Sequence, residues 1–181
     1  IGVEQSDAIA VRYYTRASDS GDAKAMFNLG MCYKNGKGVA QNDEEAIRLL
    51  KESAGKGNTN AKFVLGVLYA KGKRVGQDAK EAINFYNSAA EDGDSKAMCN
   101  LGALYESGMP GVPRNDVLAV KFFEKAIENG DPNALGAMNL GQMCIQGRAG
   151  PKGNGMDDAM RFIKQAAEAG NPKAQYDIGC M

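Results

Sequence analysis

The sequence predicts an all-α fold in which pairs of helices repeat along the chain. A short segment restarts with Asp or Asn at Asp22, Asn58, Asp94, Asp131 and Asn171, in steps of 36, 36, 37 and 40 residues. The copies share the pattern Ala-x-x-x-Leu-Gly-x-x-Tyr, then a Gly-rich loop, then an Ala that precedes a Gly by eleven residues. Because a unit this short cannot bury its own apolar face, we expect the copies to stack into a solenoid.

The repeat boundaries predict one continuous array over residues 1–181. Four complete copies span 22–57, 58–93, 94–130 and 131–170. Residues 4–21 match the second half of a repeat, and residues 171–181 match the first half. We therefore expect about ten helices, paired antiparallel.

Each complete copy predicts two helices, which we call helix A and helix B. Helix A carries apolar residues three or four positions apart, as in Ala25, Leu29 and Tyr33. The recurring Asp or Asn is its expected N-cap, since its side-chain oxygen can accept from a free backbone N–H. Helix B is expected to begin at polar residues, namely Ser6, Asn42, Asp78 and Asn115.

A glycine recurs in the middle of helix A, at Gly30, Gly66, Gly102, Gly141 and Gly179. Glycine costs about 1 kcal/mol relative to alanine inside a helix. Because this penalty recurs in every copy, we expect a structural reason that recurs as well. The expected reason is that helix A approaches helix B too closely at this position for a side-chain Cβ to fit. The fourth copy has two extra residues before Leu140 and a longer loop, which predicts a distortion over 131–155.

Composition argues against several classes of function. The 22 Lys and Arg residues balance 22 Asp and Glu residues, whereas nucleic-acid binding needs clustered excess cation. No apolar run approaches the roughly 18 residues that span a bilayer. The chain has no histidine, which removes Ser-His and Cys-His catalysis and every zinc site that contains histidine. We expect no catalysis, metal or cofactor.

The four cysteines all fall on predicted A helices, at Cys32, Cys99, Cys144 and Cys180. They form no Cys-x-x-Cys pair, and their positions put no two of them on facing neighbours. We expect four free thiols. That expectation favours a reducing compartment, while a secreted or periplasmic location stays open.

The strings DAKAMFNLGMCYKNGKGVAQNDEEAIRLLKESAGKG (22–57) and NTNAKFVLGVLYAKGKRVGQDAKEAINFYNSAAEDG (58–93) resemble the Sel-one-like repeat family, relatives of the tetratricopeptide repeats. The resemblance covers essentially the whole chain. It implies a right-handed α/α superhelix with helix A lining the concave face. It also implies a scaffold or adaptor that gathers other proteins. A few secreted relatives bind or hydrolyse β-lactams, so an enzyme of that kind is the least favoured alternative.

Analogy with tetratricopeptide repeats places a partner-binding row on helix A, two residues before and after the recurring Leu. The row is apolar and sulfur-rich, and it suits an apolar helix or an extended segment of a partner. The alternative is that the aromatic members only pack between repeats. The candidate residues are Phe27, Met31, Phe63, Val67, Cys99, Met138, Gln142 and Tyr176.

The loops from helix A to helix B are basic, whereas the turns from helix B to helix A are acidic. We expect the basic edge to meet an acidic protein or a membrane surface, with ordinary solvated loops as the alternative. The candidates are Lys34, Lys37, Lys71, Lys73 and Arg74, with Arg114 and Arg148 in the later loops.

A further alternative is a structural subunit of a larger assembly, including a membrane-associated one. The pattern leaves Tyr176, Ile178 and Met181 with no following helix to cover them. An uncovered end is a liability in a repeat protein. Another protein, or more chain, would then supply the cover.

Overall fold

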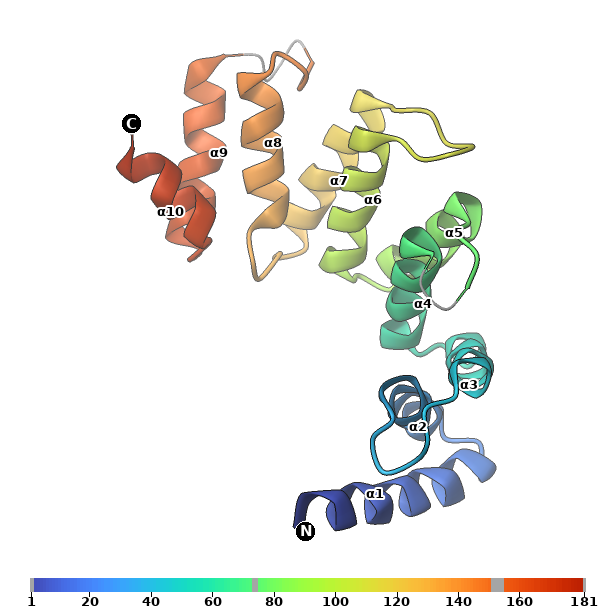
Figure 1. Ribbon diagram of the computed structural model, residues 1–181. Helices are drawn as coiled ribbons and strands as arrows, with labels where there is room; N and C mark the ends of the chain where they lie inside the picture. Colours follow the sequence, from blue (N-terminus) through green and yellow to red (C-terminus); the bar gives the residue numbers. More distant parts are fainter. Residues whose placement is uncertain (1, 73–74, 151–154, 181) are drawn as a thin grey trace. The chain divides into compact units, whose positions relative to one another are not determined.

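The computed structural model describes residues 2–72, 75–150 and 155–180, which form ten α-helices (Figure 1). Within these ranges the only extended pairing is an isolated bridge between Met109 and Val112. The predicted all-α fold is thus confirmed. The helices are α1 (Gly2–Asp19), α2 (Ala23–Asn35), α3 (Asp43–Gly55), α4 (Thr59–Lys71), α5 (Ala79–Glu91), α6 (Ser95–Ser107), α7 (Asp116–Glu128), α8 (Leu135–Ile145), α9 (Met156–Glu168) and α10 (Pro172–Gly179).

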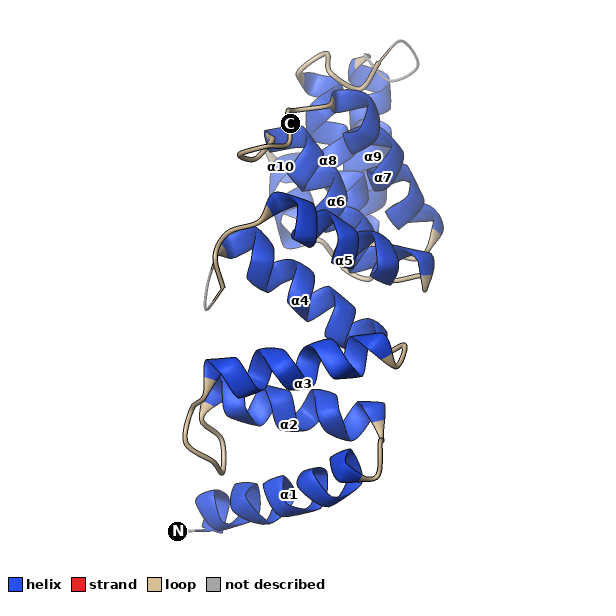
Figure 2. Cartoon of the chain, turned by 90° about the vertical axis from the view of Figure 1, so that its right-hand side faces the viewer, coloured by secondary structure: helices blue, strands red, loops and turns tan. Residues whose placement is uncertain are grey.

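The chain divides into two compact units, residues 1–89 and 90–181. In the first unit α2 packs on α3 as an antiparallel pair, with α1 against α2 and α4 against α3 (Figure 2). Its core includes Leu50, Leu65 and Leu68. In the second unit the pairs are α6 with α7 and α8 with α9, and α10 packs on α9. The A helices are therefore the even-numbered helices, and the B helices are the odd-numbered ones.

The recurring Asp or Asn residues cap four A helices, as the sequence predicts. Each side chain accepts from a backbone N–H three residues on, which satisfies one of the free donors of the first turn. The bonds are Ala25 to Asp22 at 2.6 Å, Ala61 to Asn58 at 3.0 Å, Ala97 to Asp94 at 2.8 Å and Ala174 to Asn171 at 3.1 Å.

The first helix departs from prediction. It begins at Gly2 and not at Ser6, because residues 3–5 are Val, Glu and Gln and nothing there breaks a helix. The other predicted starts of helix B are confirmed, since Asn42, Asp78 and Asn115 each accept from a backbone N–H in the first turn.

Two of the caps also tie one repeat to the previous one. The Asn58 amide donates to the carbonyl of Ala23, 3.4 Å away, and the Ser53 hydroxyl donates to the same oxygen at 2.6 Å. In the second unit the Asn171 amide donates to the carbonyl of Asn133 at 2.8 Å. A carboxylate accepts but cannot donate, so only the Asn caps make this second bond.

Helix A approaches helix B closely at the recurring glycine. A Cβ on Gly66 would lie 2.5 Å from the Tyr86 ring, and one on Gly102 would lie 2.5 Å from the Phe123 ring. The same contact occurs more loosely at Gly30, whereas Gly179 has open space around it. The expected steric reason for the glycine is confirmed in the complete repeats.

The fourth copy absorbs its extra residues before helix A. The helix α8 begins at Leu135, after Ala134 has adopted a left-handed φ of 48°. Asp131 is therefore not the N-cap that the spacing predicts. Its carboxylate instead accepts from the Gly136 N–H at 2.8 Å and from the Cys99 thiol at 3.3 Å, which anchors the extra turn to α6. Residues 151–154 of the longer loop lie outside the described ranges.

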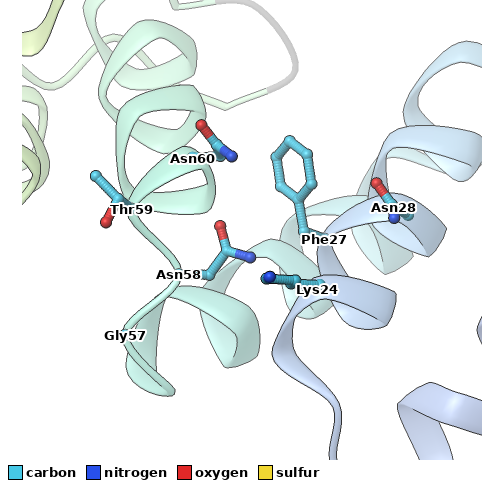
Figure 3. Close-up of a pocket in the computed structure, with 7 residues that line it drawn as sticks. All are labelled: Lys24, Phe27, Asn28, Gly57, Asn58, Thr59 and Asn60. Atoms are coloured by element: carbon cyan, nitrogen blue, oxygen red, sulfur yellow. The ribbon is translucent and has the colours of Figure 1, made fainter.

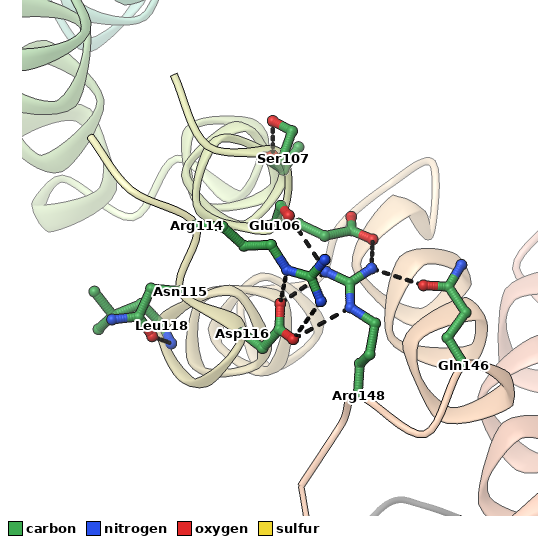
Figure 4. Close-up of polar contacts among 9 residues, drawn as sticks. Glu106, Ser107, Arg114, Asn115, Asp116, Leu118, Gln146 and Arg148 are labelled. Carbon is green, nitrogen blue, oxygen red and sulfur yellow. Dashed lines mark hydrogen bonds and ion pairs between the residues drawn. The ribbon is translucent and has the colours of Figure 1, made fainter. Parts of the chain in front are cut away.

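An ion-pair network joins the third and fourth repeats (Figure 4). Arg148, just after α8, donates to both Asp116 oxygens, at 2.7 and 3.2 Å, and to the Glu106 carboxylate at 3.2 Å. Arg114 adds two more bonds to Asp116, at 2.7 and 2.9 Å. Hydrogen bonds from Arg114 and Arg148 hold the pKa of Asp116 well below its usual range.

The close approach at Gly102 predicts a stability effect. We expect Gly102→Ala to lower the free energy of unfolding, because overpacking against the buried Phe123 costs about 1–3 kcal/mol. That cost exceeds the roughly 1 kcal/mol gained by replacing a helical glycine. Gly55→Ala is the matched control, since a Cβ at Gly55 meets nothing within 4 Å. Urea melts should show the two variants shifting in opposite directions. Equal shifts would refute the steric explanation.

The Arg148 network predicts a pH-dependent effect. Arg148→Met should lower the free energy of unfolding by about 1–2 kcal/mol at neutral pH, since it removes charge-assisted hydrogen bonds. The folded-state pKa of Asp116 is lowered, so its stabilisation is present above the unfolded pKa of about 4 and declines as the pH falls below it.

Melts of wild type and Arg148→Met should therefore converge as the pH falls from about 4 toward 2. Lys164→Met, at an exposed position, serves as the control and should change stability by less than about 0.5 kcal/mol at any pH. A gap between wild type and Arg148→Met that stayed constant with pH would count against the role of Asp116.

Candidate functional site

A shallow groove of about 390 Å³ lies in the first unit, between α2 and the turn that leads into α4 (Figure 3). Amide side chains dominate its lining, so we call it the amide groove. Its residues are Lys24, Phe27, Asn28, Gly57, Asn58, Thr59 and Asn60.

Local helix geometry brings these side chains together. Lys24, Phe27 and Asn28 are three and four residues apart on α2, which places them on one face. On the other side, Gly57 turns the chain with a φ of 86°, and the Asn58 cap then starts α4. That turn leaves Asn60 in the first turn of α4, opposite Phe27.

Phe27 forms the apolar part of the groove. It is half-buried and packs against the core cluster that contains Leu50 and Leu65. Its ring points into the space between Asn28 and Asn60 (Figure 3). The packing fixes the base of the side chain while the ring stays available at the groove surface.

The polar part consists of Lys24, Asn28 and Asn60. Lys24 and Asn60 are exposed, and Asn28 is half-buried. Each amide offers two donors and one acceptor, the complement of a peptide backbone, and the lysine offers a positive charge. The arrangement suits an extended peptide with an apolar side chain over Phe27.

Sequence reasoning found Phe27 but missed its polar neighbours. The helix A row comprises the positions two before and two after Leu29, whereas Lys24 and Asn28 lie five and one before it. These polar residues could have been found from the repeat itself, because Lys24 and Asn60 occupy the same position in consecutive copies, 36 residues apart.

The rest of the helix A row divides into accessible and buried members. Met31, Phe63, Val67 and Gln142 are half-buried, and Tyr176 is 73% exposed. The Phe63 ring lies 6.1 Å from the Tyr86 ring, so Phe63 also packs within its own repeat.

Two members of the row require correction. Cys99 is only 3% exposed and Met138 only 2%. The Cys99 thiol donates to Asp131, and Met138 packs among Ala134, Ile163 and Ala166. The extra turn before α8 covers this region, so neither side chain is available to a partner in this structure.

The basic edge is also less uniform than the sequence suggests. Lys37 and Lys71 are exposed, and Lys34 is half-buried and already engaged in an interaction. Lys73 and Arg74 lie outside the described residues. Arg114 and Arg148 are held by Asp116 and Glu106, so the described parts of the later loops do not present the positive charge expected of them.

All four cysteines are free thiols, and three of them have little nucleophilic character. Burial raises the pKa of Cys32, Cys99 and Cys144, and nearby carboxylates add to each shift. A raised pKa keeps a thiol protonated at neutral pH. Among the described side chains, no three His, Cys, Asp or Glu residues gather as metal ligands.

None of the helices that the structure describes combines the length and apolar character needed to cross a membrane.

A family model described as the Sel1 repeat matches residues 1–22, 23–58, 59–94, 95–131 and 134–171. The gap at 132–133 falls where the fourth copy has its extra turn. No curated protein matches the sequence.

Solved structures of repeat proteins resemble the chain closely. A Sel1 repeat protein from Oxalobacter formigenes is 32% identical with a TM-score of 0.85, over 96% of this chain and 69% of that one. The protective antigen c5321 of uropathogenic Escherichia coli, described as displaying an SLR fold, is 30% identical with a TM-score of 0.85. The match covers 94% of this chain but only 36% of c5321.

Cysteine rich protein B of Helicobacter pylori is 26% identical with a TM-score of 0.54, over 71% of this chain and 91% of that one. The matches to the family model cover nearly the whole chain, and the matched solved structures are helical repeat proteins as well. The chain therefore belongs to the Sel1 repeat family, whose arrays are generally protein-interaction scaffolds.

Proposed function

We propose that the chain is a non-catalytic scaffold that binds an extended segment of a partner protein in the amide groove. The observation that carries the proposal is the half-buried Phe27 ring, flanked by the amides of Asn28 and Asn60 and by the Lys24 ammonium. These groups come from two helices that packing holds in place, so the site exists before a partner arrives.

Each part of the groove has a role in recognition. An apolar side chain of the partner would cover the Phe27 ring and exclude water from it. The amides of Asn28 and Asn60 would bond the partner's backbone groups, which lose water when the segment docks. Lys24 would favour a segment with an acidic residue beside the apolar one.

Exposed lysines at the opposite, C-terminal ends of the same two A helices add positive charge to this unit. Lys37 follows α2 and Lys71 ends α4, so both belong to the two repeats that form the groove. Positive charge elsewhere on the same unit raises the association rate of an acidic partner by long-range attraction, which loses effect as salt rises. We infer that these loops assist capture while the amide groove determines which segment binds.

A peptide selection tests the proposed site. Peptides enriched from a random display library on the immobilised wild-type chain should contain an apolar residue next to an acidic one. In fluorescence anisotropy, Phe27→Ala and Asn28→Ala should each weaken binding of the enriched peptides by about tenfold, since both remove central contacts. Lys121→Glu, an exposed position on α7, should leave affinity within about twofold.

Thermal melts should first show that the groove variants remain folded. Peptides that bind equally well to the groove variants and to wild type would place the binding surface elsewhere. A selection that enriches no peptide would overturn the proposal that this groove binds extended segments.

Lys37 and Lys71 are expected to affect the rate of peptide association rather than the stability of the bound complex. The double variant Lys37→Glu, Lys71→Glu should slow association of an enriched acidic peptide and flatten its dependence on salt, with little change in dissociation rate. Stopped-flow measurements at several salt concentrations separate the two rates. A change confined to the dissociation rate would mean that these lysines contact the bound peptide.

A further inference from the structure

We propose that a cavity beside α7 binds a second kind of partner segment, an extended one that carries an apolar residue and a basic residue two positions apart. The cavity belongs to the second unit and shares no residue with the amide groove. Its charge preference is the opposite of the preference proposed for that groove, so one chain would hold two different partner segments.

The cavity has a volume of about 300 Å³ and lies between α7 and the loop that follows α8, and we call it the α7 cavity. Val117, Val120 and Ala149 give it a mainly apolar lining. Its charged lining residues are Asp116, Glu124 and Arg148. The volume is at the lower end of the range of ligand sites, about 300–1,000 Å³, which suits the side chains of a short peptide segment.

Val117 departs from the repeat pattern at an exposed position. The equivalent residues of the other complete repeats are Glu44, Lys80 and Asp157, which are all charged and exposed. Val117 is 78% exposed, more than any other large apolar side chain that the structure describes. A single exposed valine needs no explanation, but this one adjoins an apolar cavity, and joined apolar surface of this kind indicates a contact site.

Packing and hydrogen bonds fix the remaining apolar lining. Val120 and Ala149 pack against the buried core cluster that contains Phe123 and Leu140. Arg148, next to Ala149 in the chain, bonds to side chains of α6 and α7 (Figure 4). The α7 cavity therefore exists before a partner binds, so a docking segment does not have to order it.

The charges at the cavity favour a basic partner. Arg148 has five N–H donors, and each has an acceptor on Asp116, Glu106 or Gln146, which leaves none for an anion. Glu124 is exposed, and no residue that the structure describes forms an ion pair with it. The Glu124 carboxylate is therefore the charge that a partner meets, and it favours Lys or Arg.

Helix geometry sets the spacing between the two partner residues. Val117, Val120 and Glu124 are three and four positions apart, which places them along one face of α7. The helix rises about 6 Å from Val120 to Glu124. Alternate residues of an extended chain project to the same side, about 6.6 Å apart. An apolar side chain at the two valines therefore brings a basic residue two positions away to Glu124.

A peptide selection with prior depletion tests the proposal. A random display library is first depleted on the immobilised Glu124→Lys chain and then selected on wild type, which keeps peptides that need Glu124. These peptides should carry Lys or Arg two positions from an apolar residue, and they should shift the methyl NMR signals of Val117 and Val120. A selection that enriches no peptide, or enriches peptides without a basic residue, would overturn the proposal.

Fluorescence anisotropy with the enriched peptides then separates the two contacts. Glu124→Lys should weaken binding by at least about tenfold, and Val117→Ser by about fivefold, since each removes one of the two anchors. Both positions are exposed, so folding should be preserved, which circular dichroism melts verify. Glu168→Lys makes the same charge change at an exposed position of α9 outside the cavity, and it should leave affinity within about twofold.

A charge swap completes the test. Peptides whose basic residue is replaced by Glu should lose binding to wild type and regain it with Glu124→Lys. Phe27→Ala, which disables the amide groove, should bind the original peptides as wild type does, so a failure of one site is distinguishable from a failure of the other. Swapped peptides that do not bind Glu124→Lys, or original peptides that bind Val117→Ser as tightly as wild type, would refute binding in the α7 cavity.

Discussion

The structure depends on the distance between helix A and helix B, which a single glycine sets in each complete repeat. At Gly66 and Gly102 the ring of an aromatic residue occupies the volume that a Cβ would need. The helices can approach this closely because one of them has no side chain at the crossing. The residue that fills the notch is Leu in one repeat, Tyr or Phe in the next two and Ile in another. The fold therefore constrains the glycine more strongly than the residue packed against it.

This packing determines which residues are left for function. In α2 the side that carries Met26 and Gly30 is buried against its paired helix, and Leu29 is buried as well. Lys24 and Asn28 lie on the remaining side and take no part in the core. Such positions can change without loss of stability, which is how repeats with one architecture present different binding surfaces. The amide groove combines two such positions with Phe27, whose ring contributes to the core and to the surface.

Polar contacts hold the irregular segments of the fourth copy, alongside the apolar packing of Ala134 and Ala149. The extra residues of the fourth copy form a turn that Asp131 holds through the Gly136 N–H and the Cys99 thiol. After α8, Arg148 connects the loop back to Asp116 and Glu106 of the previous repeat. In these contacts, charged side chains that would otherwise face solvent are paired with one another. The positive character of the loops is therefore confined, among the described residues, to those of the first two complete repeats.

Much of this architecture could be read from sequence alone. The period, the Asn and Asp caps and the mid-helix glycines are local signals, because each depends on residues within one repeat or on its regular recurrence. The hydrogen bond of Cys99, the ion pairs of Arg148 and the amide groove join residues 30 or more positions apart, and Met138 is buried partly by residues 25 and 28 positions away. Asp116 meets Arg148 only because α7 packs on α8, and Asn60 faces Phe27 only because α3 holds α2 and α4 together. The sequence by itself determined the repeating unit, whereas the tertiary structure decided which side chains the stacked units leave exposed, since exposure is set by neighbours in space and not along the chain.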